Sequence, residues 1–340
     1  MIAKPGVEKP DKGPWVVDLQ LGMEFIGYYV ARNPRLDSFR DACRGKYLRM
    51  QLLDRTGVIE ARMWEGAEEI FEEINGGGPI KVAGTVENFR DTPQINVWRL
   101  RPARDEEVDI SDMIRTTERE VGAMWDFVFK AMEGIQDTHL AALVRYFYAD
   151  SEWVIRFMEA PSARRVHHSC HGGFLEHTYE LLVLARPLLE LYPEIGADLL
   201  ISGILLHDIG KMEELSWDFD TDYTDEGRLL GHIILGGKLI SHAIDTIDGF
   251  PRERALEVLH LVISHHGRLE WGSPRRPKTI EAVALHYLDN LDAQVNRFKL
   301  LIEEARANGQ PWTAYDRMLR RSLYAGNGMN LSVEENGFME

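Results

Sequence analysis

The chain lacks the features that build secreted and membrane proteins. Only two of its 340 residues are cysteines, Cys43 and Cys170, so no disulfide framework is expected and neither cysteine has a metal-type partner nearby. No run approaches the roughly 18 apolar residues that a membrane-spanning helix needs, and the first residues lack the apolar core of a signal peptide. We therefore expect a cytoplasmic protein without a membrane partner.

Positive charge is also scarce. The chain has 39 Lys and Arg residues against 55 Asp and Glu residues, which gives a net charge of −16. This charge disfavours nucleic-acid binding by electrostatics alone. Bound divalent cations would offset it locally, so a nucleic-acid substrate stays open. The length favours two domains over one.

The region 15–105 has short alternating segments and no histidine. Segments 47–54 (YLRMQLLD) and 58–64 (VIEARMW) alternate in polarity around the turn Arg55-Thr56-Gly57, which predicts a β-hairpin. The other elements expected here are one helix and two strands, at 67–74, 80–89 and 94–102. About five strands with one late helix match a small closed β-barrel of the OB type. Another small barrel or sandwich is the alternative.

Aromatic and basic side chains in this region suggest a use for the barrel. Phe89 and Trp98, with several strand arginines, would provide stacking surfaces and cations for single-stranded nucleic acid. The competing interpretation is a solvated strand face with Trp98 in the core.

The rest of the chain is helical in pattern. Apolar residues recur at three- and four-residue spacing through 121–326, which predicts an all-α domain. The acidic, polar segment 106–120 is the expected linker, and we expect flexible ends at 1–14 and 327–340. The fold class is therefore multidomain, with a small N-terminal β-barrel followed by an all-α domain.

Histidine placement carries the chemistry. Residues 1–138 contain no histidine, whereas eleven of the twelve lie between His167 and His286. In GILLHDIGK (203–211), His207 and Asp208 end a largely apolar helix, where a buried carboxylate needs compensation that a metal supplies most simply. Adjacent helix positions point about 100° apart, so other helices must contribute. The candidates there are His177, His232, His265, His266, Asp289 and Asp292.

The order H…HD…H…HH…D resembles the HD superfamily of metal-dependent phosphohydrolases, whose members are all-α. The longer strings HHSCHGGFLEHT, ISGILLHDIGKMEEL, GRLLGHI, ISHHGRLEWGSPRRP and LHYLDNLDA are similar to those of the YhaM-type bacterial 3′→5′ exoribonucleases. In that family an OB-type domain precedes the HD domain. The resemblance covers roughly residues 15–310.

The resemblance implies a ligand set of two groups. His177, His207, Asp208 and Asp289 would bind one metal, and Asp208 would bridge to a second metal held by His232 and by His265 or His266. The cyclic-dinucleotide HD enzymes use three metals, with a glutamate four residues before the first ligand. That position is Gly173 here, which favours two divalent ions. Mn²⁺ is the expected ion, while Fe²⁺, Co²⁺, Ni²⁺, Zn²⁺ and Mg²⁺ also fit such ligands.

The expected reaction is hydrolysis of a phosphodiester. Two ions sharing Asp208 can activate a water molecule and neutralise a phosphate oxygen. Lys211 is expected to contact the scissile phosphate, with a helix-dipole role as the alternative. His167 and His168 resemble the family's histidine pair. We assign His168 to protonation of the leaving 3′-oxygen and His167 to substrate contact, while a supporting or packing role stays open for both.

A basic loop follows the last histidine pair. Arg275, Arg276 and Lys278, in GSPRRPK (272–278), would form a local track for an RNA backbone, with an ordinary solvated loop as the alternative.

These features predict a 3′→5′ exoribonuclease that hydrolyses single-stranded RNA to nucleoside monophosphates, with DNA as an alternative substrate. A phosphohydrolase of mononucleotides or cyclic dinucleotides is the second interpretation, but it leaves the barrel without a task. A non-catalytic single-strand-binding regulatory protein is the third, and the complete set of ligand positions argues against it. The sequence leaves the oligomeric state open, a homo-oligomer included.

Overall fold

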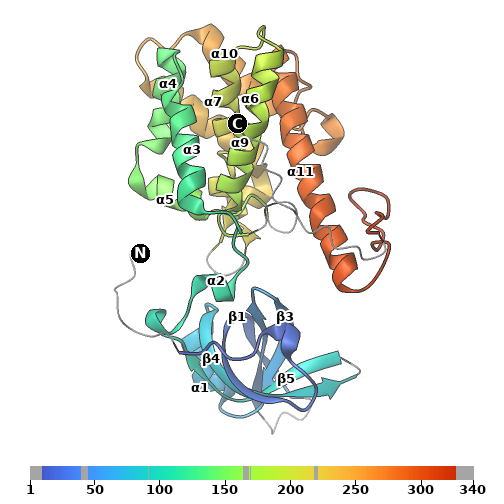
Figure 1. Ribbon diagram of the computed structural model, residues 1–340. Helices are drawn as coiled ribbons and strands as arrows, with labels where there is room; N and C mark the ends of the chain where they lie inside the picture. The colour runs from blue at the N-terminus through green and yellow to red at the C-terminus, as the bar shows by residue number, and fades with distance from the viewer. Residues whose placement is uncertain are drawn as a thin grey trace.

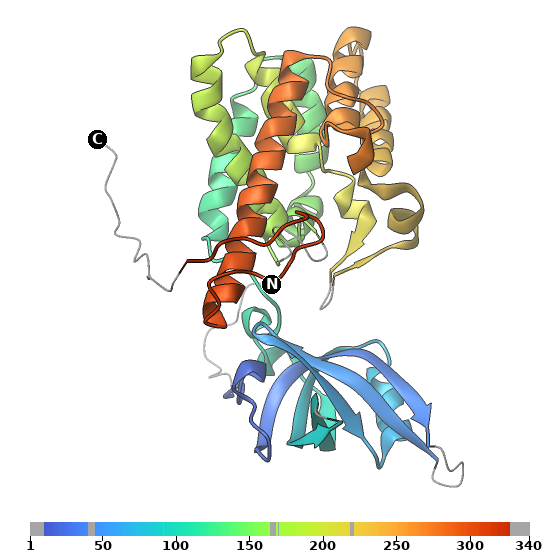
Figure 2. The same cartoon turned by 90° about the vertical axis from the view of Figure 1, so that its right-hand side faces the viewer.

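The computed structural model describes residues 10–39, 45–90, 92–163, 168, 170–217 and 221–326. They form a β-barrel and a helical bundle, joined by a segment that contains α2 (Figures 1 and 2). The elements in chain order are η1 (Val16–Asp18), β1 (Glu24–Ser38), β2 (Lys46–Asp54), β3 (Gly57–Met63), α1 (Ala67–Ile74), β4 (Gly78–Phe89), β5 (Thr92–Pro102), η3 (Asp105–Glu107), α2 (Ile110–Met113), α3 (Val121–Glu133), α4 (Thr138–Tyr148), α5 (Ser151–Glu159), α6 (Gly173–Leu191), α7 (Ala197–Leu206), α8 (Lys211–Glu214), β6 (Leu215–Ser216), β7 (Asp222–Tyr223), α9 (Asp225–Thr246), α10 (Arg252–Ser264), η4 (Leu269–Trp271) and α11 (Ile280–Ala307).

The five N-terminal strands close into a barrel in the order β1-β2-β3-β5-β4. Strand β1 completes the circle, because its first half pairs with β4 and its second half with β2, across a register shift between Arg32 and Arg35. Strands β3 and β5 pair in parallel, and α1 lies between β3 and β4 in the chain. This Greek-key order with one late helix is the OB arrangement, so the predicted barrel is confirmed.

A buried ion pair holds the segment just before η1 on this barrel. Lys12 Nζ lies 2.5 Å from Asp54 Oδ2, and the same carboxylate accepts hydrogen bonds from the backbone N–H groups of Val16 and Thr56. Lys12 Nζ also stacks over the ring of Tyr29, 4.1 Å from its centroid. Residues 1–14 are expected to be flexible from the sequence. The structure differs at Lys12, which is only 8% exposed, because the isolated carboxylate of Asp54 needs a cation.

The helical domain has one continuous apolar core, to which α3, α4, α6, α7, α10 and α11 all contribute. The predicted helices are present, and α5, α8 and α9 complete the domain. A two-stranded sheet of β6 and β7 is a local exception to the all-α prediction. Within the described ranges, no helix has the length and apolar character needed to cross a bilayer.

The segment 106–120 is ordered against both domains. Met113 of α2 packs against Tyr28, Val30 and Leu53 of the barrel. A few residues later, the backbone of Thr116 forms an isolated parallel β-bridge with that of His171, just ahead of α6. The predicted linker therefore docks on the barrel at one end and on the bundle at the other.

Replacement of Asp54 by alanine tests the ion pair. We expect the variant to lose about 3–5 kcal/mol of barrel stability, because Lys12 is left buried without its partner. Urea unfolding followed by fluorescence provides the measurement. The matched variant Asp37→Ala removes the half-exposed partner of Arg35 and should lose less than about 1 kcal/mol. Equal losses in the two variants would contradict a structural role for the buried pair.

The same pair sets an expected pH dependence. Burial alone would raise the pKa of Asp54, but hydrogen bonds from Lys12 and Thr56 outweigh it and lower the pKa. The ionised carboxylate of Asp54 therefore stabilises the folded state fully above its pKa in the unfolded chain, which is near 4. This stabilisation is lost as the pH falls through the lower pKa that Asp54 has in the folded chain. Between about pH 7 and pH 3, the unmodified chain should lose more stability than Asp54→Ala. A larger acid loss in the variant would refute this assignment.

Candidate metal centre

Five helices bring the predicted ligands together. Helix α7 is buried on nearly every side, so its end delivers His207 and Asp208 into the protein interior. His177 comes from α6 and Asp289 from α11, while the remaining histidines come from α9 and the end of α10. Residues far apart in the sequence thus surround the single carboxylate of Asp208.

His177, His207 and Asp289 surround one oxygen of Asp208, and with Asp208 they form the first group of ligands. His177 Nε2 lies 3.4 Å from His207 Nε2 and 3.4 Å from Asp289 Oδ1. Asp208 Oδ2 lies 3.3 Å from His207 Nε2 and 3.8 Å from His177 Nε2. A cation with bonds of about 2.0–2.2 Å holds its ligands at such separations. These four side chains therefore fit a divalent ion.

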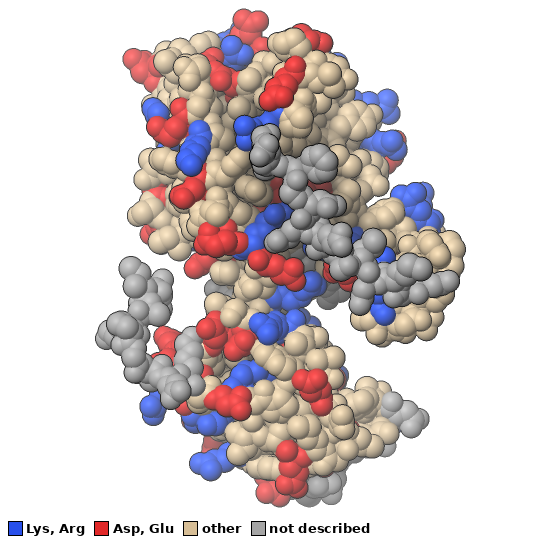
Figure 3. Space-filling view, in the orientation of Figure 1, with Lys and Arg blue, Asp and Glu red and all other residues tan. Residues whose placement is uncertain are grey.

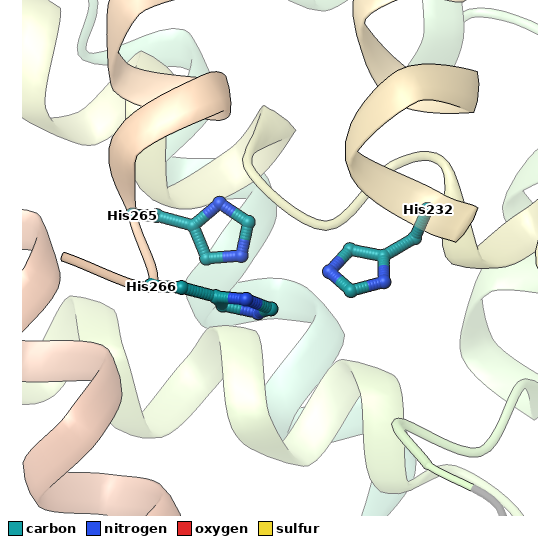
Figure 4. Close-up of side chains that lie close together, drawn as sticks. All are labelled: His232, His265 and His266. Atoms are coloured by element: carbon teal, nitrogen blue, oxygen red, sulfur yellow. The ribbon is translucent and has the colours of Figure 1, made fainter. Parts of the chain in front are cut away.

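The second group faces the other oxygen of Asp208. Asp208 Oδ1 lies 3.5 Å from His232 Nε2 and 3.6 Å from His265 Nε2. These three atoms are buried, and none has a hydrogen-bond partner in the described part of the chain. Buried polar atoms without partners are rare, so their convergence on one point fits a second cation. His266 belongs to the same cluster, and Figure 4 shows the three imidazoles turned toward one another.

Contacts behind the rings fix their orientation. Each of the five histidines has its Nδ1 within hydrogen-bond distance of a carbonyl or carboxylate oxygen. Because Nδ1–H donates there, Nε2 keeps its lone pair for the centre. The pairs are His207 with Ile204 O at 2.9 Å, His265 with Val262 O at 2.7 Å, His266 with Trp271 O at 2.9 Å, His232 with Glu214 Oε1 at 3.2 Å and His177 with Asp292 Oδ2 at 2.7 Å.

A glycine turns His232 toward the centre. Gly231 interrupts α9 with φ 74° and ψ 157°, which lies in the left-handed region that favours glycine. The kink frees the backbone N–H of His232, which donates to Glu214 Oε1 at 3.0 Å. The same carboxylate oxygen therefore satisfies the backbone and the ring of His232.

The charges around Asp208 keep it ionised. Burial alone would raise the pKa of Asp208, but Lys211 and the surrounding histidines outweigh it and hold the pKa well below its usual range. Lys211 Nζ lies 2.5 Å from Asp208 Oδ2 and 3.4 Å from Ser162 Oγ. Burial also lowers the pKa of His265 well below its ordinary value, so this imidazole is neutral and free to act as a ligand.

His168 lies behind the centre. Its Nε2 is 3.0 Å from Asp292 Oδ2 and its Nδ1 is 3.3 Å from Glu176 Oε2. Asp292 in turn contacts the Nδ1 of His177, on the side of that ring that faces away from Asp208. Because both ring nitrogens face carboxylates, this geometry favours the supporting role that the sequence left open, and the role of His168 as the acid for the leaving oxygen stays a prediction. His167 lies outside the described residues.

The main chain of His168 also explains why residue 173 is a glycine. A Cβ atom at position 173 would lie 2.0 Å from the carbonyl oxygen of His168, far inside van der Waals contact. His168 itself has φ 49°, an uncommon conformation for a residue other than glycine. Backbone therefore occupies the space that a glutamate side chain at position 173 would need.

The basic loop follows η4 and packs on α10. Arg275, Arg276 and Lys278 are exposed. The loop is anchored by buried Ser273, whose hydroxyl donates to the carbonyl oxygens of Ile263 and Arg275 at 3.1 and 2.8 Å. The backbone N–H of Lys278 donates to His260 Nε2 at 2.9 Å, so the loop runs back along α10.

The barrel presents an aromatic surface larger than the sequence suggested. Phe39, Tyr47 and Trp64 pack with ring centroids 4.9–5.7 Å apart. We call this set the barrel aromatic cluster. Arg62 continues it, because its guanidinium lies 4.6 Å from the ring centroid of Phe89. The pairing of β2 with β3, in which Leu48 lies opposite Met63, brings Tyr47 and Trp64 to the same end of the hairpin.

Trp98 is exposed because of a β-bulge. Ala83 pairs with Arg99 and Gly84 pairs with Val97, so Trp98 is the extra residue on β5. Its side chain is 52% exposed. Trp98 therefore lies outside the core, and the alternative of a core tryptophan is wrong.

A cavity of about 580 Å³ lies where the barrel meets the bundle. Its lining includes Arg55 from the β2–β3 turn, Arg115 from the linker, and Asn296 and Lys299 from α11. His168 reaches its wall. Figure 3 shows Lys and Arg side chains between the barrel and the bundle, on a face that carries both positive and negative side chains.

Metal analysis tests the two groups separately. We expect the unmodified chain to bind about two divalent ions, His232→Ala to retain about one, and Asp208→Ala to retain neither, because Asp208 serves both groups. Elemental analysis after dialysis against Mn²⁺ provides the counts. Asp245→Ala, an exposed position on α9, is the matched control and should bind as the unmodified chain does. Full metal content in Asp208→Ala would rule out the shared carboxylate.

Comparisons with known proteins agree with this architecture. The family model described as HD domain matches residues 174–294. The 3′-5′ exoribonuclease YhaM of Bacillus subtilis (strain 168) is 34% identical over 78% of this chain and 84% of its own length, and that of Geobacillus sp. (strain WCH70) is 34% identical over 87% and 91%. A chain of a replication protein A heterotrimer bound to ssDNA matches 29% of this chain and 72% of its own length, at 25% identity and a TM-score of 0.20. A barrel of OB topology, an HD domain and this extent of identity lead to one assignment: the chain belongs to the YhaM family of 3′→5′ exoribonucleases.

Proposed function

We propose that this chain removes nucleotides from the 3′ end of single-stranded RNA by metal-dependent hydrolysis and releases nucleoside monophosphates. The observation that carries the proposal is the carboxylate of Asp208, whose two oxygens face two separate groups of buried ligands. The proposed direction of degradation and the choice of RNA as substrate come from the name of the relatives, 3′-5′ exoribonuclease. We propose Mn²⁺ as the ion, since Asp208 and Asp289 supply the carboxylate ligands that suit it.

The roles of the side chains follow from their positions. Divalent cations at such a site supply Lewis acidity and lower the pKa of a water molecule. His177, His207 and Asp289 would hold one ion, and His232 with His265 or His266 the other. Asp208 serves both.

Lys211 keeps a positive charge beside this carboxylate. Burial would lower the pKa of its ammonium group, but Asp208 outweighs burial and raises it. We propose that Lys211 contacts the scissile phosphate. Its charge would stabilise the negative charge on the phosphate oxygens as the P–O3′ bond breaks.

The barrel would hold the strand that feeds this centre. Bases can stack on the barrel aromatic cluster and on Phe89, whose rings are partly or largely exposed, and such stacking is tolerant of sequence. Trp98 offers another exposed ring, and Arg275, Arg276 and Lys278 offer exposed cations on the loop that follows α10 and η4. A phosphohydrolase of mononucleotides would have no use for these surfaces. A polynucleotide substrate accounts for both domains.

End-labelled RNA tests the reaction. With added Mn²⁺, 5′-labelled single-stranded RNA should shorten progressively and release nucleoside monophosphates, and DNA of the same sequence should be compared in parallel. Asp208→Ala should reduce the rate by at least about a thousandfold, since it removes a ligand from both groups. Asp245→Ala controls for the substitution itself and should retain full activity. Internal cleavage products, or equal activity of Asp208→Ala, would exclude the proposal.

Trp64→Ala tests the barrel surface. Loss of one stacking side chain should weaken binding of long RNA by about 1–3 kcal/mol, seen as a higher KM. Turnover of a small phosphodiester, bis(p-nitrophenyl) phosphate, should not change, because this substrate reaches only the metal centre. Leu21→Ala removes another exposed apolar side chain of the barrel and should alter neither value. An unchanged KM for long RNA in Trp64→Ala would remove the barrel aromatic cluster from the RNA path.

A further inference from the structure

We infer that Arg119 and His168 are positioning residues of the metal centre, which hold the metal ligand His177 through Asp292. The inference rests on the proposed function only in taking His177 as a ligand. Arg119 belongs to the linker segment that connects the barrel to the bundle, so the linker supports the centre directly.

The first step is the contact between Asp292 and His177. Asp292 Oδ2 accepts a hydrogen bond from His177 Nδ1 at 2.7 Å, and both side chains are almost fully buried. A carboxylate behind a ligand imidazole fixes the ring and makes it a better donor to a metal. The orientation of His177 is therefore only as firm as the orientation of Asp292.

His168 holds Asp292 from the other side. Its Nε2 lies 3.0 Å from the same oxygen, Asp292 Oδ2, and its side chain is only 1% exposed. The Nδ1 of His168 contacts Glu176 Oε2 at 3.3 Å, so the ring is clamped between two carboxylates. The main chain is held as well, because the N–H of Ser162 donates to the carbonyl oxygen of His168 at 3.0 Å.

Glu180 brings a further carboxylate to the same point. Its Oε2 lies 3.6 Å from His168 Nε2, and Asn296 Nδ2 donates to it at 3.2 Å. The side chains of Glu176 and Glu180 are each less than a fifth exposed. Three carboxylates thus surround one imidazole, and such a cluster needs another cation to stay in place.

Arg119 is that cation. Its Nε and Nη2 lie 3.1 and 2.6 Å from Glu180 Oε1, and its Nε lies 3.3 Å from Glu176 Oε1. Arg119 follows a backbone contact in which the N–H of Thr117 donates to the carbonyl oxygen of His171 at 2.9 Å. A single chain of charged contacts therefore leads from the half-exposed guanidinium in the linker to the ring of His177.

Cobalt binding tests the inference. Co²⁺ alone is titrated into metal-free protein, and its affinity and visible absorption spectrum are recorded for the unmodified chain, Arg119→Ala and Arg119→Lys. We expect Arg119→Ala to bind the tighter Co²⁺ equivalent about tenfold more weakly and with a shifted spectrum. Arg119→Lys, which keeps the charge but loses the planar fork, should recover part of the affinity.

The controls separate this inference from the proposed function. Arg145→Ala removes an exposed arginine that pairs with Glu133 elsewhere in the same domain, and it should bind Co²⁺ normally. In Arg119→Ala, kcat for bis(p-nitrophenyl) phosphate should fall while KM for long RNA stays the same. Asp208→Ala should lose the ions altogether, and Co²⁺ binding by that variant would overturn the proposed metal centre. Unchanged Co²⁺ affinity and spectrum in a folded Arg119→Ala would overturn the positioning role alone.

Discussion

A carboxylate buried among apolar helices must be surrounded by groups that neutralise it, and Asp208 imposes this condition on the whole helical domain. Helix α7 has almost no exposed face, so its end can place Asp208 only in the interior. The surrounding helices then supply histidines, each tethered at Nδ1 so that Nε2 points inward. The kink at Gly231 and the buried Glu214 serve the same requirement at one ligand.

The acidic chain separates its charges by function. Its net charge of −16 would repel RNA over most of the surface. Stacking on the aromatic rings of the barrel depends little on charge, and basic side chains line the cavity between barrel and bundle. Under the proposed function, the barrel would therefore hold RNA by stacking more than by charge.

The sequence predicted the elements whose patterns are local. The helix at 67–74 matches α1 in both bounds, and the alternating segments match β2 and β3 within one residue, because turn residues and polarity specify them. The metal ligands were predicted because histidines cluster and resemble a known motif. Lys12 and Arg119 could not be identified in this way, since a single cation shows its role only through distant partners. The resemblance to the family's histidine pair suggested a catalytic role for His168, and no sequence pattern reports its left-handed conformation or the carboxylates around its ring.

The contact between the carbonyl oxygen of His168 and Gly173 bears on how HD domains diversify. A third metal ligand at position 173 would require the main chain of His168 to move away, which would also withdraw its ring from Asp292. A single substitution can therefore neither add that ligand nor leave the existing centre intact. The carbonyl oxygen of His168 therefore limits which residues position 173 accepts, whatever chemistry a side chain there could offer.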